Sequence, residues 1–195
     1  MRSIPRVLSS SIAVLVLCAC GAGASPAAPP PCDQSCQDGV ALRGTREAMK
    51  LAFNLLVQAH PVGAQDSHGD CRSSNGASHG SVRVFGDATS NAVQGSSFVD
   101  LEYDFVDCAY SVPPSVTPEQ NYGLVFTGHV RQKGTIAVQP SSTTALVIES
   151  ESLSLSGTVY DPPVDYAADA CALSITQQGS QVSGTLCGRN AGFTF

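Results

Sequence analysis

The chain has 195 residues, a formal net charge of −6 at neutral pH, no tryptophan and only 6% aromatic residues. An acidic chain with few aromatic rings is poorly suited to phosphate backbones and stacked bases, so we expect no nucleic-acid partner. The scarcity of aromatic side chains also argues against sugar binding, while the length suffices for a domain with a hydrophobic core.

The first 19 residues have the layout of a secretory signal peptide. Arg2 and Arg6 give a positively charged start, and an apolar segment follows from Val7 to Ala19. At about 13 residues this segment is shorter than the roughly 20 that a helix needs to cross a bilayer. No later segment is long and apolar enough to span either, so we expect an exported chain without a transmembrane helix.

Two cysteines stand at the end of the apolar segment, in the run "LCAC" at residues 17–20. Signal cleavage requires small residues at the cut, and cleavage before Cys20 places Ala19 there, whereas cleavage before Cys18 would place Leu17 there. The run resembles the lipobox of bacterial lipoproteins, Leu-x-small-Cys. The resemblance implies a lipid on the Cys20 sulfur and a place in the cell envelope. In a Gram-negative host, Gly21 after the lipidated cysteine implies the outer membrane, with its face left open.

Residues 20–31 then form a tether of small residues and prolines, "GAGASPAAPPP" after the cysteine, which favours extended backbone. Two or three acyl chains hold a protein firmly on a membrane, so membrane lipid is the expected partner. The alternative is an ordinary signal peptide cut near Ala24 or Ala28, which leaves Cys20 unmodified or discarded. Without the two signal arginines, eight basic and sixteen acidic residues remain, a formal charge of −8.

The predicted single domain, residues 32–195, opens with a helix between Val40 and His60. Apolar residues recur there at spacings of three and four, which indicates a helix with one buried face. Asp38 is the expected N-cap, and Pro61 stops further helix. The residues that make up the apolar stripe are Met49, Ala52, Phe53 and Leu56, widened by Leu51, Leu55 and Val57.

The rest of the chain reads as strands. The run "FVDLEYDF" at 98–105 alternates between apolar and acidic residues, as a strand with one buried face does. The other predicted strands are 80–86, 122–131, 134–139, 145–149, 152–160, 171–177 and 181–187. We therefore predict an α+β fold in which one N-terminal helix packs on a curved antiparallel sheet, with a β-sandwich carrying an N-terminal helix as the alternative.

Six cysteines remain in the mature domain, and an even number in an exported chain indicates disulfides. We predict the pairs Cys171–Cys187, Cys71–Cys108 and Cys32–Cys36. The spacing in "CDQSC" is not that of a redox motif.

The last predicted hairpin, "CALSITQQGSQVSGTLC", leaves its own register open. A three-residue loop at Gln178–Ser180 sets Cys171 opposite Cys187, whereas a two-residue loop pairs Leu173 with Leu186 and sends the cysteines to opposite faces. We expect the first.

The segment 60–80 contains the residues best suited by type to catalysis or metal binding. "GASHG" matches the nucleophile elbow of α/β-hydrolases around Ser78, but a strand pattern follows where that motif needs a helix. His68, Asp70 and His79 are candidate zinc ligands in what reads as a long loop, although their spacing matches no regular ligand pattern and Cys71 is expected to be oxidised. We therefore predict no catalytic residue, metal site or cofactor.

The acidic row Asp100, Glu102 and Asp104 occupies one strand face, and a flat row cannot surround a calcium ion. We expect a solvated face. The sequence thus predicts a non-enzymatic binding or structural module held at the membrane surface, whose small-molecule or protein partner it does not name. The alternatives are a carrier of a hydrophobic ligand in a half-barrel cavity, similar to half-barrel lipoprotein carriers in architecture only, and a metal-dependent hydrolase that uses His68 and His79.

Overall fold

A computed structural model describes residues 28–72, 78–91, 93, 95–137 and 143–195. Within these residues the chain forms one long helix and one eight-stranded antiparallel sheet whose strands lie in sequence order. The elements are α1 Gln34–Leu56, β1 Gly63–Arg72, β2 Ser78–Asn91, β3 Ser96–Ser111, η1 Pro118–Gln120, β4 Tyr122–Ala137, β5 Ala145–Val159, β6 Val164–Gln178, β7 Gln181–Leu186 and β8 Arg189–Thr194.

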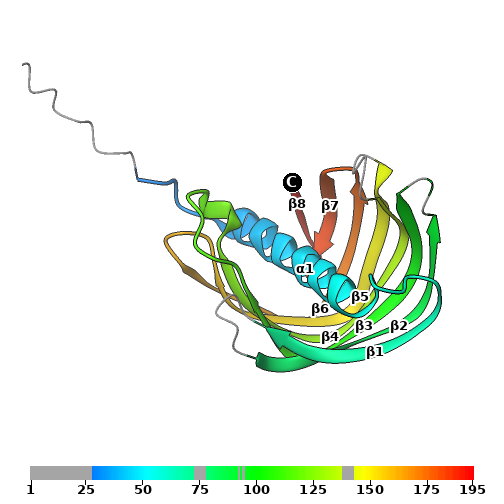
Figure 1. The fold of residues 1–195 in the computed structure, drawn as a ribbon. Coiled ribbons are helices and arrows are strands. Elements are labelled where there is room, and N and C mark those ends of the chain that lie inside the picture. The colour runs from blue at the N-terminus through cyan, green and yellow to red at the C-terminus, as the bar shows by residue number, and fades with distance from the viewer. Residues whose placement is uncertain (1–27, 73–77, 92, 94, 138–142) are drawn as a thin grey trace, which may run out of the picture.

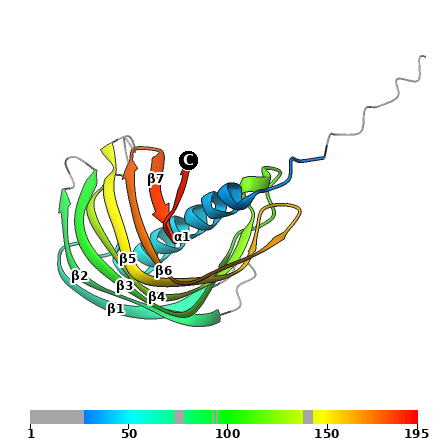
Figure 2. The same ribbon diagram turned by 180° about the vertical axis from the view of Figure 1, so that it is seen from behind.

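The sheet curves without closing, and α1 lies along its concave face (Figure 1). Seen from behind, the long strands form a trough around the helix (Figure 2). The predicted α+β class is confirmed, and a single sheet takes the place of the two sheets of the sandwich alternative. No helix among the described residues has both the length and the apolar character that a membrane span requires.

Helix α1 begins at Gln34, earlier than the apolar periodicity predicts. Asp33 is the N-cap, and its carboxylate accepts a hydrogen bond from the Cys36 backbone N–H at 2.9 Å. Asp38 was wrongly predicted as the cap, because it lies inside the first turns and is completely buried. The helix ends at Leu56, ahead of Pro61, and its buried face fills the trough.

Several predicted strands are joined into longer ones. The segment 122–131 and residues 134–137 of the next predicted segment belong to a single strand, β4, because Gly134 has a φ of +131° and continues the ladder opposite Leu146, while 138 and 139 lie outside the described residues. A side chain at this position would place a Cβ 2.1 Å from the Ala145 carbonyl oxygen. Glycine therefore bends the strand here without ending it. The segments 145–149 and 152–160 are likewise one strand, β5, with a register shift between Ser150 and Leu153.

The two edge strands, β1 and β8, were not predicted from the sequence. Strand β1 lies in the segment that was predicted to be a loop, and it alternates between exposed and half-buried positions. Its inward positions hold small or polar residues, so no apolar alternation marks the strand. These positions are Gln65, Ser67, Gly69 and Cys71.

The β6–β7 hairpin has the two-residue loop, so the expected register was wrong. Leu173 lies opposite Leu186, and Gln178 lies opposite Gln181. Cys171 and Cys187 nevertheless form a disulfide, with a Cα–Cα distance of 4.7 Å. The bond forms because Cys187 lies beyond the end of β7, in the turn to β8, with a φ of +53°.

All three predicted disulfide pairs are present in the structure. Cys32–Cys36 spans the start of α1, and Cys71–Cys108 joins β1 to β3. Both Cys71 and Cys108 are fully buried in the single core, which lies between α1 and the concave face. The largest side chains of that core are Tyr103, Phe105, Phe126, Leu42 and Met49.

Candidate functional site

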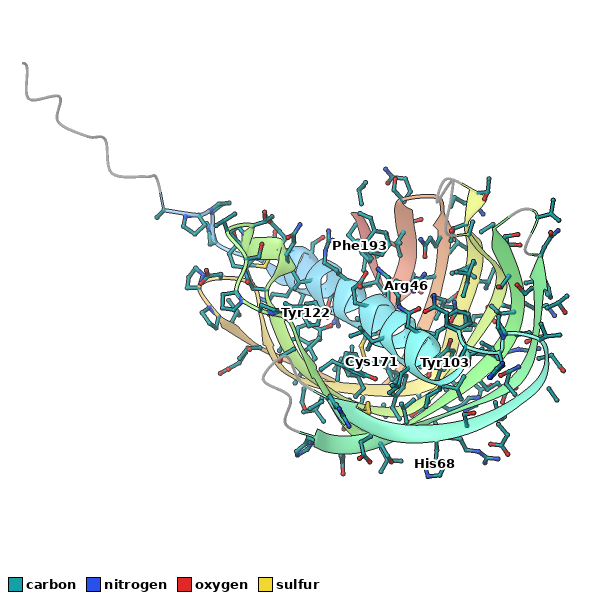
Figure 3. All side chains as sticks on the ribbon, in the orientation of Figure 1. Arg46, His68, Tyr103, Tyr122, Cys171 and Phe193 are labelled. Carbon is teal, nitrogen blue, oxygen red and sulfur yellow. A yellow bond between two sulfur atoms is a disulfide. The ribbon has the colours of Figure 1, made fainter. Side chains whose placement is uncertain are left out.

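The predicted metal candidates lie on the outside of the sheet. His68 and Asp70 are exposed on β1, and Figure 3 shows His68 pointing away from the helix. His79 is exposed at the start of β2, and its Nδ1 lies 2.8 Å from the Asp107 carbonyl oxygen. The described residues contain no group of three or more histidine, cysteine, aspartate or glutamate side chains placed to hold a metal ion. These candidates are therefore not brought together as a ligand set.

Ser78 is the first residue of β2, opposite Arg72 on β1. A nucleophile elbow requires a turn from a strand into a helix, which lifts the serine and supplies oxyanion donors from the helix N-terminus. Here the serine opens a strand, so the structure lacks the context that the motif requires.

Side chains of the neighbouring strand β4 contact the acidic row on β3, and two of them are cations that pair with Asp100. Arg131 donates to both carboxylate oxygens of Asp100 at 3.0 Å, and Lys133 lies 2.9 Å from the same carboxylate. The hydrogen bond from Lys133, followed by that from Arg131, lowers the pKa of Asp100. His129 lies between the other two members of the row, Glu102 and Asp104, at 3.3 and 2.7 Å. The row is a solvated face of cross-strand ion pairs.

A recess of about 440 Å³ lies on the other side of the sheet, between the C-terminal half of α1 and the adjoining ends of β4, β5 and β6. This volume falls within the range of small-molecule sites. The inner wall is buried and the rim is exposed. The inner wall is formed by Arg46, Phe53, Gln132, Ala137, Thr144 and Gln177, and the rim includes Lys50, Asn54, Gln58, Ser180 and Phe195.

Arg46 brings a buried positive charge to this recess. Only 6% of its surface is exposed, and its Nε donates to the Gln177 Oε1 at 2.7 Å. Within the described part of the chain this is the only hydrogen bond of the guanidinium, and no carboxylate forms an ion pair with it. Burial lowers the pKa of Arg46, against the opposing influence of Tyr103 and Glu47. A buried charge without an ion pair in direct contact is costly and marks a candidate functional site.

Gln132 adds an unused amide to the same wall. It is 1% exposed and lies on the inner face of β4 between Leu101 of β3 and Ile148 of β5. Neither its amide nitrogen nor its amide oxygen has a hydrogen-bond partner in the described structure, and the buried Tyr103 hydroxyl also lacks one. Figure 3 labels Tyr103 and Arg46 inside the trough, and Tyr103 is one of the groups that oppose the lowering of the Arg46 pKa. Unpaired buried polar groups are rare in folded proteins and call for an explanation.

The opposite end of the helix has a buried charge of another kind. The Asp38 carboxylate accepts hydrogen bonds from Arg189 at 2.6 and 2.8 Å, from the Tyr166 hydroxyl at 2.8 Å and from the Gln34 side chain at 3.1 Å. These donors come from β8, from β6 and from the helix itself, so the group fastens α1 to the last part of the sheet.

No sequence pattern singled out Arg46, Gln132 or Gln177 as site residues. A signal for Arg46 was present, since it lies four residues after Leu42 and three before Met49, within the apolar stripe. Gln132 and Gln177 occupy inward strand positions next to apolar residues. Which residues they face follows only from the register of the sheet.

Comparison of the chain with models of known protein families, with curated proteins and with solved structures found no match.

Proposed function

We propose that this protein is a non-enzymatic binding module of the bacterial cell envelope, anchored by lipid at Cys20 and holding a small amphipathic molecule in the recess beside α1. The observation that carries the proposal is the recess itself. Its wall combines a buried unpaired cation, Arg46, and an unpaired amide, Gln132, with apolar side chains such as Phe53. Binding sites typically pair an apolar lining with a few fixed polar groups.

The recess supports a small ligand over a bulky lipid. Most of the trough is filled by α1 and by the side chains of the core, including Met49, Tyr103 and Phe126. Of the alternatives drawn from the sequence, a carrier of a wholly apolar molecule fits the charged wall less well. The alternative of a hydrolase that uses His68 and His79 is not supported, because the two residues lie exposed on separate strands.

The place of the recess agrees with an anchor at the N-terminus. The tether meets the domain at Pro30, whose carbonyl accepts a hydrogen bond from the Tyr160 hydroxyl at 2.8 Å, next to the start of α1. Arg46 lies 13 residues after Asp33, which is about 20 Å along a helix that rises 1.5 Å per residue. The recess thus lies about 20 Å along the helix from the point where the tether joins the domain.

Membrane attachment is tested with Cys20→Ser, with Cys18→Ser as the matched control. We expect Cys20→Ser to abolish acylation and to give either a soluble protein or an uncleaved precursor, because the thioether needs the Cys20 sulfur. The measurements are detergent-phase partitioning and the mass of the N-terminal peptide. Partitioning into detergent that survives Cys20→Ser, with no acyl chain lost, would exclude Cys20 as the anchor.

Occupancy of the recess is tested on the oxidised chain from residue 20 onward carrying Cys20→Ser, which keeps every described residue. The probe is N-phenyl-1-naphthylamine, an uncharged aromatic molecule that fluoresces in apolar surroundings. We expect binding that Ala137→Phe removes, because a phenyl ring there fills the recess. Ala172→Phe, on the exposed face of β6, is the matched control and should bind as the parent does. Binding that both variants retain equally would refute the recess as the site.

A further inference from the structure

The polar groups of the recess indicate which ligand chemistry it suits. Arg46 has one neutral partner, Gln177, which engages Nε alone. A guanidinium has five N–H donors, and those on its two Nη atoms are arranged for a planar acceptor. A carboxylate accepts two parallel hydrogen bonds from such a fork and also brings the counter-charge.

Gln132 is a second donor on the same wall. Its amide is buried to 99% and has no partner in the described structure, so a ligand oxygen that it reaches satisfies a group for which folding provides none. Because its strand neighbours Leu101 and Ile148 are apolar, Gln132 has no role in the sheet that an apolar residue would not fill. This is an observation independent of Arg46, and it concerns the same recess.

The charge of the recess favours a monoanion over a phosphate. Arg46 is the one buried cation that lines it among the described residues. Lys50 at the exposed rim is 3.5 Å from Glu47, which also lines the recess and whose carboxylate repels a dianion more strongly than a monoanion. A phosphate dianion has three oxygens to satisfy and usually needs more than one cation.

The apolar part of the lining limits the rest of the ligand. Phe53, Ile136, Ala137 and Phe195 line the recess beside its polar groups. A volume of about 440 Å³ suits a molecule of drug-like or medium-chain size.

We infer that the recess binds a small apolar monocarboxylate, such as a medium-chain fatty acid or an aryl acid, with its carboxylate on Arg46 and Gln132. This inference rests on the proposed function, because it names the ligand class of the same site. Arg46 and Gln132 are then binding residues, and Gln177 is a positioning residue that holds the guanidinium by its Nε.

The test uses three eight-carbon probes on the chain from residue 20 carrying Cys20→Ser: octanoate, 1-octanol and octyl phosphate. Calorimetric titration near neutral pH should give octanoate the highest affinity, at least tenfold above 1-octanol. Arg46→Met should remove that preference while leaving 1-octanol binding the same or tighter. Arg43→Met is the matched control, since Arg43 lies one turn earlier on α1 and contacts Phe193 and Thr194 instead of the recess. It should leave all three affinities unchanged.

A second measurement does not depend on whether the Arg46→Met variant folds. Octanoate should shift the side-chain amide resonances of Gln132 in the parent protein, and Gln132→Leu should weaken octanoate binding several-fold while 1-octanol binding persists. Equal affinity for octanoate and 1-octanol, with N-phenyl-1-naphthylamine still bound, would refute the carboxylate and leave the binding module standing. Tighter binding of octyl phosphate would also overturn the carboxylate assignment. Failure of every probe, the uncharged fluorophore included, would remove both proposals.

Discussion

Helix α1 carries a buried charge in each half, and the two charges are treated in opposite ways. Asp38, in the N-terminal half, receives four hydrogen bonds, two of them from the Arg189 guanidinium. Arg46 lies eight residues later, about 12 Å along the helix, and has a single bond from its Nε to a neutral amide. Both side chains face the same trough and are almost completely buried.

The difference separates a polar group that serves the fold from one that serves a ligand. The four hydrogen bonds to the Asp38 carboxylate all come from this chain, so they compensate for its burial. Arg46 has a recess where its partners should be, and beside it Gln132 has unused hydrogen-bonding capacity of its own. The two halves of α1 thus differ in whether the buried charge finds its hydrogen-bond partners within the chain. Measurements on each half test this interpretation.

The largest effect is expected at the N-terminal half. Asp38→Ala leaves the Tyr166 hydroxyl and the Arg189 guanidinium without their acceptor, and breaking a buried pair typically costs about 3–5 kcal/mol. Because the Arg189 side chain is 43% exposed, we expect a loss of unfolding free energy of about 3 kcal/mol, at the low end of that range. Urea unfolding measures it. Asp165→Ala, one residue before Tyr166 and exposed, should change stability by less than about 0.5 kcal/mol.

The same group predicts how stability depends on acid. Burial alone would raise the pKa of Asp38, but the hydrogen bonds from Arg189, Tyr166 and Gln34 outweigh burial and lower it. A carboxylate with a lowered folded pKa stabilises the fold above its unfolded pKa of about 3.9, and this contribution disappears as the pH falls through the folded pKa.

Stability should therefore fall as the pH drops below about 5 and through the lowered folded pKa of Asp38, and the fall should be shallower in Asp38→Asn. Urea midpoints measured across that window give the two slopes. Because Asp66 and Asp100, whose pKa values are also lowered by their ion pairs, are unchanged in the variant, the difference in slope reports Asp38 alone. Parallel slopes would show that the Asp38 carboxylate does not carry this dependence.

The smallest effect is expected at the C-terminal half, and its sign is reversed. Gln132→Leu replaces an unpaired buried amide by an apolar side chain of similar size between Leu101 and Ile148, which should raise the unfolding free energy by about 1–2 kcal/mol. Gln178→Leu, at an exposed position near the end of β6, is the control and should change little. A loss of stability in Gln132→Leu would mean that the amide serves the fold after all.

Sequence patterns predicted those parts of the fold whose residues follow one periodicity. Strand β3 alternates through Val99, Leu101, Tyr103 and Phe105, and all four are buried as expected. Strand β1 was not predicted because its inward side chains are small or polar and all but Cys71 are only half-buried, so no apolar alternation marks the strand. The predicted hairpin register was wrong because the disulfide does not need Cys171 and Cys187 to lie opposite each other in the strands. The turn at Cys187 brings the two sulfur atoms together.

The candidate site depends on contacts between segments far apart in the chain. Arg46 and Gln177 are 131 residues apart, and no periodicity relates them. The arginine was visible as an exception within an apolar stripe, but whether a carboxylate would neutralise it depended on the fold. The lipid anchor, by contrast, is a prediction from sequence alone, and Cys20 lies outside the described residues.

The order of the strands also bears on the order of folding. Each strand pairs with the next one in the chain, so the sheet grows through local hairpins, whose contacts form at small entropic cost. Helix α1 is made before any strand, yet its Asp38 must wait for Arg189, 151 residues later, and its Arg43 for Thr194. The helix therefore cannot complete its docking until β8 is in place. Until then its apolar stripe lacks its final cover, which leaves apolar surface exposed in the incompletely folded chain.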